Sequence, residues 1–109
     1  ALAREQPDAF AVRIDGDSMA PLLEHGDLAV LSPSKLARDG RAAVVQLHRQ
    51  IGVTCKLFRR AADAVHLTPV NRQYQAQAVP PRQVVWALEV LATVRTAPAA
   101  PGPGEDEGG

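Results

Sequence analysis

The sequence predicts a mainly β domain built from many short strands. Apolar and polar residues alternate with a period of two over most of the chain, which is typical of strands with one buried face. Glycine and proline separate these segments at positions that suit turns. The 109 residues suffice for one domain, and because aromatic residues make up only 4% of them, the core must consist of Val, Leu, Ile and Ala.

The first three strands follow from short apolar segments. Phe10, Val12 and Ile14 alternate with Ala, Arg and Asp, so they predict a strand that buries the face carrying these three side chains. Residues 27–31 (DLAVL) and 42–48 (AAVVQLH) predict two further short strands.

The next strands are separated by clear turn signals. Gly52 marks a turn into residues 53–58 (VTCKLF), which we expect to pair with residues 42–48 as a hairpin. Another short strand is expected over residues 64–67. Residues 69–82 contain three prolines and are expected to be mostly loop.

Residues 84–95 are long enough for a helix, but their Val and Thr content favours an extended strand or a pair of strands. One short helix is expected earlier in the chain. Ser18 can cap it, Pro21 suits its first turn, and Gly26 stands where a helix end favours a left-handed residue.

The ends of the chain differ from its middle. Residues 1–7 are interpreted as a linker remnant, residues 8–96 as the folded domain, and residues 97–109, rich in Pro, Gly and acidic groups, as a disordered tail. No apolar run is long enough to span a membrane, no signal-peptide pattern is present, and the single cysteine suits a reducing compartment, so we expect a cytoplasmic protein. The net charge is zero and basic residues are scattered, which argues against DNA binding by this chain alone.

Ser18 is the first candidate for chemistry. It lies in the run Ile-Asp-Gly-Asp-Ser-Met, at the expected junction of a strand and a helix, where backbone N–H groups can hold a developing oxyanion. Gly16 allows a tight turn there. The alternative is that Ser18 only caps the helix.

Lys56 is the second candidate, with Thr54 beside it. Residues two apart on a strand share a face, so Thr54 and Lys56 are expected to point the same way. Apolar neighbours would desolvate the amine and favour its neutral form, which can take a proton from a serine hydroxyl. Only two of the twelve basic residues are lysine, and arginine cannot act as such a base. The alternative is a lysine that extends from a strand edge into water.

Other chemistries have weaker support. His48 and His66 fall on the polar phase of their strands and His25 lies in a turn, so a Ser-His-Asp arrangement is not expected. One cysteine and three dispersed histidines give no metal-ligand spacing, and no Gly-rich phosphate loop is present. We therefore expect no metal and no cofactor.

Several segments together resemble the peptidase domains of the LexA, UmuD and phage-repressor family. Residues 10–31 are similar to its serine motif, and residues 40–45 followed by 53–56 to its lysine motif. Residues 65–74 (VHLTPVNRQY) are similar to a strand and loop of the same fold. Type I signal peptidases, which are distant relatives, share the Ser-Met and Gly-Asp elements.

This resemblance implies the compact C-terminal domain of a LexA-like regulator, with short, mostly antiparallel strands. Ser18 would attack a peptide carbonyl and Lys56 would act as general base and then as acid. The backbone N–H groups of Asp17 and Ser18 would form the oxyanion hole, with Met19 as a supporting residue. Relatives cleave a loop of their own polypeptide upstream of the serine, after a RecA-filament signal in the SOS response.

The implied partners are a second copy of the chain and the protein's own upstream segment; DNA would bind only through a helix-turn-helix domain absent here. The Ala-Gly or Cys-Gly bond that family members cleave does not occur in these 109 residues, and Leu57 follows the lysine where many relatives have a basic residue. Two alternatives remain open: a non-enzymatic dimerisation and sensing module, or a protease that acts in trans like a signal peptidase.

Overall fold

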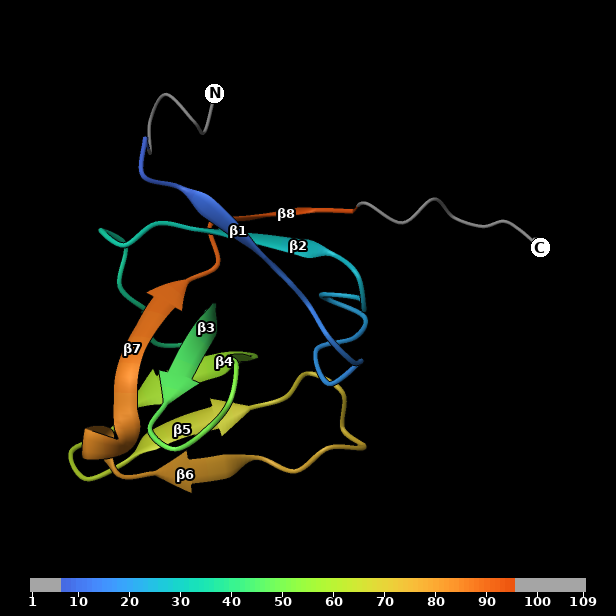
Figure 1. Cartoon of the computed structure of the whole chain (residues 1–109). Coiled ribbons are helices and arrows are strands. Elements are labelled where there is room, and N and C mark those ends of the chain that lie inside the picture. Colours follow the sequence, from blue (N-terminus) through green and yellow to red (C-terminus); the bar gives the residue numbers. More distant parts are fainter. Residues whose placement is uncertain (1–6, 96–109) are drawn as a thin grey trace.

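The computed structural model describes residues 7–95, and they form two antiparallel sheets (Figure 1). The small sheet has the order β1-β2-β8 and the large sheet the order β6-β5-β4-β3-β7. This arrangement confirms the mainly β prediction. The strands are β1 (Phe10–Arg13), β2 (Leu28–Leu31), β3 (Ala42–Leu47), β4 (Thr54–Arg60), β5 (Val65–Thr68), β6 (Gln77–Val79), β7 (Val84–Glu89) and β8 (Ala92–Val94).

Most predicted strands are present, and the hairpin of β3 and β4 is confirmed by the antiparallel pairing of Val45 with Thr54. Residues 84–95 form two strands, as one of the expectations had it, but β7 and β8 belong to different sheets. The segment 69–82 is less irregular than expected, because it contains β6 and a short 3-10 helix, Pro81–Gln83.

The short helix predicted after Ser18 is wrong. Residues 18–22 form successive turns, with a backbone hydrogen bond of 3.1 Å from Ala20 N–H to Asp17 O and one of 3.0 Å from Leu23 N–H to Met19 O. Pro21 has no N–H to donate, and a proline disfavours helical dihedrals in the residue before it. The continuous series of hydrogen bonds that a helix needs therefore does not form.

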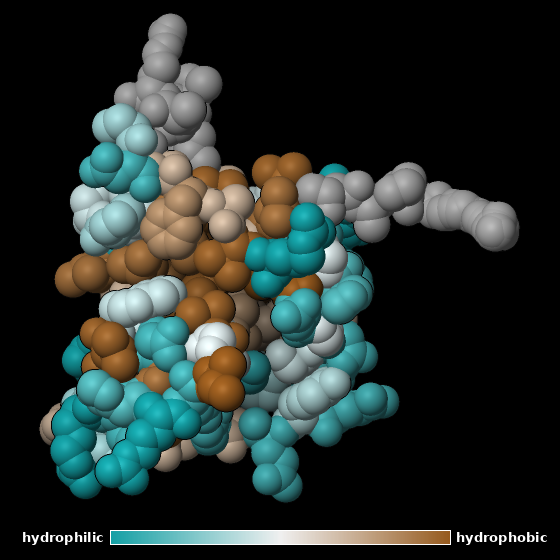
Figure 2. Space-filling view, in the orientation of Figure 1, coloured by the Kyte–Doolittle hydropathy of each residue, from teal (hydrophilic) through white to brown (hydrophobic). Residues whose placement is uncertain are grey.

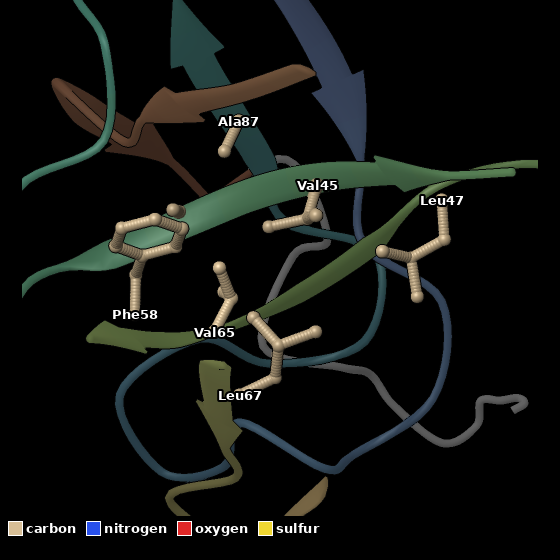
Figure 3. Close-up of a cluster of buried hydrophobic side chains, with 7 residues drawn as sticks. Val45, Leu47, Phe58, Val65, Leu67 and Ala87 are labelled. Atoms are coloured by element: carbon tan, nitrogen blue, oxygen red, sulfur yellow. The ribbon is translucent and has the colours of Figure 1, made fainter. Parts of the chain in front are cut away.

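The larger core lies against one face of the large sheet (Figure 3). Phe58 from β4 meets side chains of β3, β5 and β7, and all of them are buried below a tenth of their surface. Apart from Phe58 the cluster is aliphatic, as the low aromatic content predicts. Its members are Ala43, Val45, Leu47, Phe58, Val65, Leu67 and Ala87.

A second core joins the two sheets. Val44, which points to the opposite face of β3 from Val45, packs with Ile14, Ala29 and Leu31 of the small-sheet side and with Leu88 of β7. β3 is therefore buried on both faces.

The outer end of β1 departs from the prediction of a fully buried face. Ile14 is buried and Val12 half-buried, but Phe10 is 42% exposed. β1 is an edge strand, and Phe10 lies beyond the part of it that the second core covers. An apolar groove of about 400 Å³ results, and Figure 2 shows hydrophobic residues gathered across the middle of this face. We call its lining the apolar band: Phe10, Pro33, Leu36, Trp86 and Leu88.

An ionic cluster fixes the connection between β2 and β3. Arg38 donates to both carboxylate oxygens of the nearly buried Glu89, at 2.9 and 3.1 Å, and Arg41 lies 3.7 Å from Glu89. The Arg38 hydrogen bonds lower the pKa of Glu89. The Glu89 N–H also donates to Lys35 O at 3.0 Å, so this connection is held to the end of β7.

The expected linker remnant (1–7, apart from Pro7) and tail (97–109) lie outside the described residues. Over residues 7–95, the structure contains no helix that is both long and apolar enough to cross a membrane.

We expect Leu67→Ala to lower the free energy of unfolding by about 2–5 kcal/mol, because it leaves a cavity in a fully buried cluster. Urea denaturation followed by circular dichroism measures this. Leu22→Ala is the control, since Leu22 is 56% exposed and its truncation removes little packing. Equal losses in the two variants would contradict the assignment of the core.

Candidate functional site

Ser18 lies in the turn that follows β1, which we call the serine turn (residues 15–20). The chain leaves β1 through the buried Ile14 and reverses at Gly16, whose φ of +79° favours glycine. The Gly16 N–H donates to Nδ1 of His25 at 2.8 Å. The turn is therefore held at its start by a side chain from the returning segment.

The Gly-Asp element fixes the return to β2. Gly26 has a φ of +93° and donates its N–H to Ile14 O at 2.8 Å, and Ile14 N–H donates to Asp27 O at 2.8 Å. Asp27 is only 3% exposed; its carboxylate accepts the Glu24 N–H at 2.9 Å and pairs with Arg95 at 3.4 Å. A buried carboxylate is stable here because both of its oxygens have partners.

The hairpin of β3 and β4 brings Lys56 to Ser18, which is 38 residues earlier in the sequence. Lys56 Nζ donates to Ser18 Oγ at 3.1 Å and to Thr54 Oγ1 at 2.9 Å. Burial lowers the pKa of Lys56, against a smaller opposing effect of Cys55. The structure therefore places a serine hydroxyl next to an amine whose burial lowers its pKa and so makes it easier to deprotonate than an exposed lysine.

A cleft of about 350 Å³ opens beside this pair. The end of β1, the serine turn and the tip of the β3–β4 hairpin form its walls, so it combines an apolar lining with the polar groups of Ser18, Thr54 and Lys56. Its lining residues are Val12, Arg13, Ile14, Asp15, Ser18, Met19, Val44, Ile51, Gly52, Val53, Thr54, Cys55 and Lys56.

The serine turn leaves backbone donors available. Within residues 7–95, the N–H groups of Asp17 and Ser18 have no hydrogen-bond acceptor. The side chain of Met19 is 1% exposed and anchors the turn in the interior. Free N–H groups next to a serine hydroxyl are suited to hold the negative oxygen of a tetrahedral intermediate.

Cys55 also lines the cleft, but it is a poor nucleophile. Burial raises the pKa of its thiol to about 11, more strongly than the charge of Lys56 lowers it. The thiol therefore stays protonated at neutral pH. Because the thiolate is the reactive form, Cys55 is unreactive there.

No histidine is hydrogen-bonded to Ser18 among the described residues. His25 binds the Gly16 N–H, His48 is exposed at the end of β3, and His66 lies on β5. Over the same residues, no group of three His, Cys, Asp or Glu side chains gathers as a metal site would need.

Four residues at this site have no role assigned from the sequence. His25 and Asp27 shape the two ends of the turn, as described above. Asn71 and Tyr74, from the loop after β5, bind Asp17 and Ser18. Strand periodicity carries no information on such contacts. The only sequence signal for this loop is the resemblance of residues 65–74 to a strand and loop of the known family.

Comparison with known proteins identifies the family of this chain. Residues 1–94 match the family described as Peptidase S24-like. The LexA repressor of Desulfatibacillum aliphaticivorans is 36% identical over 69 residues, which cover 62% of this chain and 33% of that protein. The LexA repressor of Erythrobacter litoralis is 35% identical over 78 residues, 71% of this chain and 33% of the relative.

The LexA repressor of Leptospira biflexa is 33% identical over 67 residues, covering 61% of this chain and 32% of the relative. This chain therefore spans about a third of the length of these curated relatives. With a family match over nearly the whole chain, the protein belongs to the Peptidase S24-like family.

Proposed function

We propose that this domain is the peptidase and regulatory part of a LexA-like transcriptional regulator, with Ser18 as nucleophile and Lys56 as general base. The observation that carries this proposal is the 3.1 Å separation of Ser18 Oγ and Lys56 Nζ at a lysine whose pKa burial lowers. Family membership and the LexA repressor relatives support the same conclusion.

In the proposed reaction, neutral Lys56 accepts the proton of the Ser18 hydroxyl while Oγ attacks a peptide carbonyl carbon. The carbonyl oxygen becomes negative and receives hydrogen bonds from the N–H groups of Asp17 and Ser18. The C–N bond then breaks, and the Lys56 ammonium protonates the leaving amine. Water hydrolyses the acyl-enzyme with Lys56 again as base. Thr54 orients the amine through its 2.9 Å hydrogen bond.

The proposed substrate is a segment of the same polypeptide upstream of this domain, in the cytoplasm. The relatives that support this proposal are named repressors, and cleavage between a DNA-binding domain and this one would relieve repression. A RecA filament is the proposed trigger. No Ala-Gly or Cys-Gly bond occurs in the 109 residues, so a longer form of the protein would have to supply the bond.

A fluorophosphonate probe tests the nucleophile directly. We expect labelling of Ser18, located by peptide mass spectrometry, at a rate that rises with pH to a midpoint below 10.5, the ordinary pKa of lysine. Ser18→Ala abolishes labelling. Lys56→Ala slows it about 10²- to 10⁴-fold, the usual contribution of a general base.

Lys56→Arg is the matched control, because arginine keeps the positive charge but cannot accept the proton. It should be as slow as Lys56→Ala. Labelling of the Arg variant at the wild-type rate would show that Lys56 is not the base.

The pKa of Lys56 also predicts how stability depends on pH. The folded chain releases this proton at a lower pH than the unfolded chain, whose lysine retains a pKa near 10.5. Between the two pKa values the unfolded chain binds more protons, so raising the pH stabilises the folded wild type. Lys56→Met has no such proton to release, so its stability does not rise for this reason. In urea titrations from pH 7 to 10.5, the unfolding free energy of the wild type should therefore increase relative to that of Lys56→Met. A difference between the two that stays constant with pH would contradict the lowered pKa of Lys56.

A second candidate function, a module that only pairs two regulator chains, is favoured by the apolar band. We propose that the band contacts a second copy, because Phe10 and Leu36 are exposed beside an apolar groove.

Leu36→Asp is expected to convert the dimer to a monomer in sedimentation velocity, whereas Leu22→Asp, at an exposed leucine outside the band, leaves it unchanged. A dimer in which Ser18 resists the probe would favour the pairing module over the peptidase.

A further inference from the structure

The loop between β5 and β6 reaches across the molecule to the serine turn. Asn71 donates its backbone N–H to Ser18 O at 2.9 Å and its side-chain Nδ2 to Asp17 O at 3.1 Å. The Tyr74 hydroxyl donates to Oδ1 of Asp17. We call these three contacts the clasp.

We propose that Asn71 and Tyr74 are positioning residues, which set the direction of the Ser18 N–H and the place of the Ser18 side chain relative to Lys56. This inference rests on the proposed function of Ser18. It gives a role in that function to the loop between β5 and β6, which contains neither Ser18, Lys56 nor the oxyanion donors.

The clasp acts on the peptide unit that supplies an oxyanion donor. Asp17 O and the Ser18 N–H belong to one planar trans peptide group, so they point in opposite directions. Two donors hold this oxygen: Asn71 Nδ2 at 3.1 Å and Ala20 N–H at 3.1 Å. Fixing the oxygen therefore also fixes the N–H, which has no acceptor among the described residues and is left for the oxyanion.

Tyr74 acts on the charge of Asp17. A carboxylate free to approach the developing oxyanion would oppose it electrostatically, because both are negative. The hydrogen bond to the Tyr74 hydroxyl commits one carboxylate oxygen to the loop. This hydrogen bond thereby holds the negative charge of Asp17 toward the loop and away from the developing oxyanion.

The clasp also connects the two halves of the dyad. β5 pairs with β4 through residues 57–60, directly after Lys56, so the loop that follows β5 is fixed to the strand that carries the base. The serine turn, in contrast, extends from the small sheet. Asn71 is thus a direct polar link between the nucleophile's backbone and the sheet of the base.

Probe labelling of Ser18 in the intact 109-residue chain tests the proposal. We expect Asn71→Ala to lower the labelling rate about tenfold or more and Tyr74→Phe about threefold to tenfold, the effect of losing one net hydrogen bond in a site where small misplacement matters. The pH midpoint of labelling in Tyr74→Phe should match the wild type, since the surroundings of Lys56 are unchanged. Gln75→Ala, at an exposed residue of the same loop, is the control and should label normally.

Asn71→Asp distinguishes two roles of Asn71: positioning the serine turn, or only holding its own loop in shape. It retains the Oδ1 that accepts the Gln73 N–H at 3.0 Å but loses the donor to Asp17 O. If Asn71 only orders its own loop, Asn71→Asp restores the wild-type rate and the proposal is overturned. If the donor matters, this variant is as slow as Asn71→Ala.

Amide hydrogen exchange gives a readout that does not need activity. In Asn71→Ala, the Ala20 amide, which shares the Asp17 O acceptor, should exchange about tenfold faster, while the Val44 amide in β3 stays as protected as in the wild type. If the wild type is not labelled by the probe at any pH, the proposed function is wrong, and hydrogen exchange then becomes the only test of the clasp. An unchanged Ala20 rate then overturns it, and a faster one supports it.

Discussion

The packing of Val44 between the two sheets is the contact on which the geometry of this domain depends. β3 places Val45 in the core of the large sheet and Val44 against Ile14, Ala29 and Leu31 on the side of the small sheet. The serine turn continues directly from Ile14, and the β4 segment paired with β3 carries Lys56. One strand buried on both faces therefore determines how far Ser18 lies from Lys56. Since the second core contains few side chains, polar contacts must define the remaining details of the turn.

Those polar contacts explain why the serine turn is ordered without a helix. His25 holds its first peptide, Asp27 and Gly26 close the return to β2, and Asn71 holds the carbonyl groups at its centre. The first N–H groups of a helix have no partner within the helix, which is why a helix start was expected to leave donors near Ser18. The series of turns also leaves the N–H groups of Asp17 and Ser18 without an acceptor among the described residues. These donors therefore do not depend on the predicted helix.

Alternation and local patterns were sufficient to predict most of the strands, but not β6, and they identified Ser18 and Lys56 only as separate candidates. The prediction that these two residues act together came from the resemblance to a known family. Thr54 and Lys56 are two residues apart on a strand, and in the structure Lys56 donates to both Thr54 and Ser18. The helix at residues 18–26 was predicted from capping preferences, and the conformational effect of Pro21 on Ala20 outweighed them. Asn71 and the separation of β7 from β8 into different sheets were beyond prediction, because each depends on contacts between distant segments. A local pattern contains no information on which sheet a strand joins.

Burial acts on two neighbouring residues of β4 in opposite chemical directions. It lowers the pKa of Lys56 and raises that of Cys55 to about 11, so both groups are driven toward their neutral forms. A thiolate at residue 55 would stabilise the Lys56 ammonium, and the effect of the Cys55 charge on Lys56 has that sign. Because the thiol stays protonated at neutral pH, it supplies no such charge. An Asp or Glu in its place would hold Lys56 in the ammonium form, which cannot accept the serine proton. An uncharged side chain at position 55 therefore keeps an anion away from the Lys56 amine.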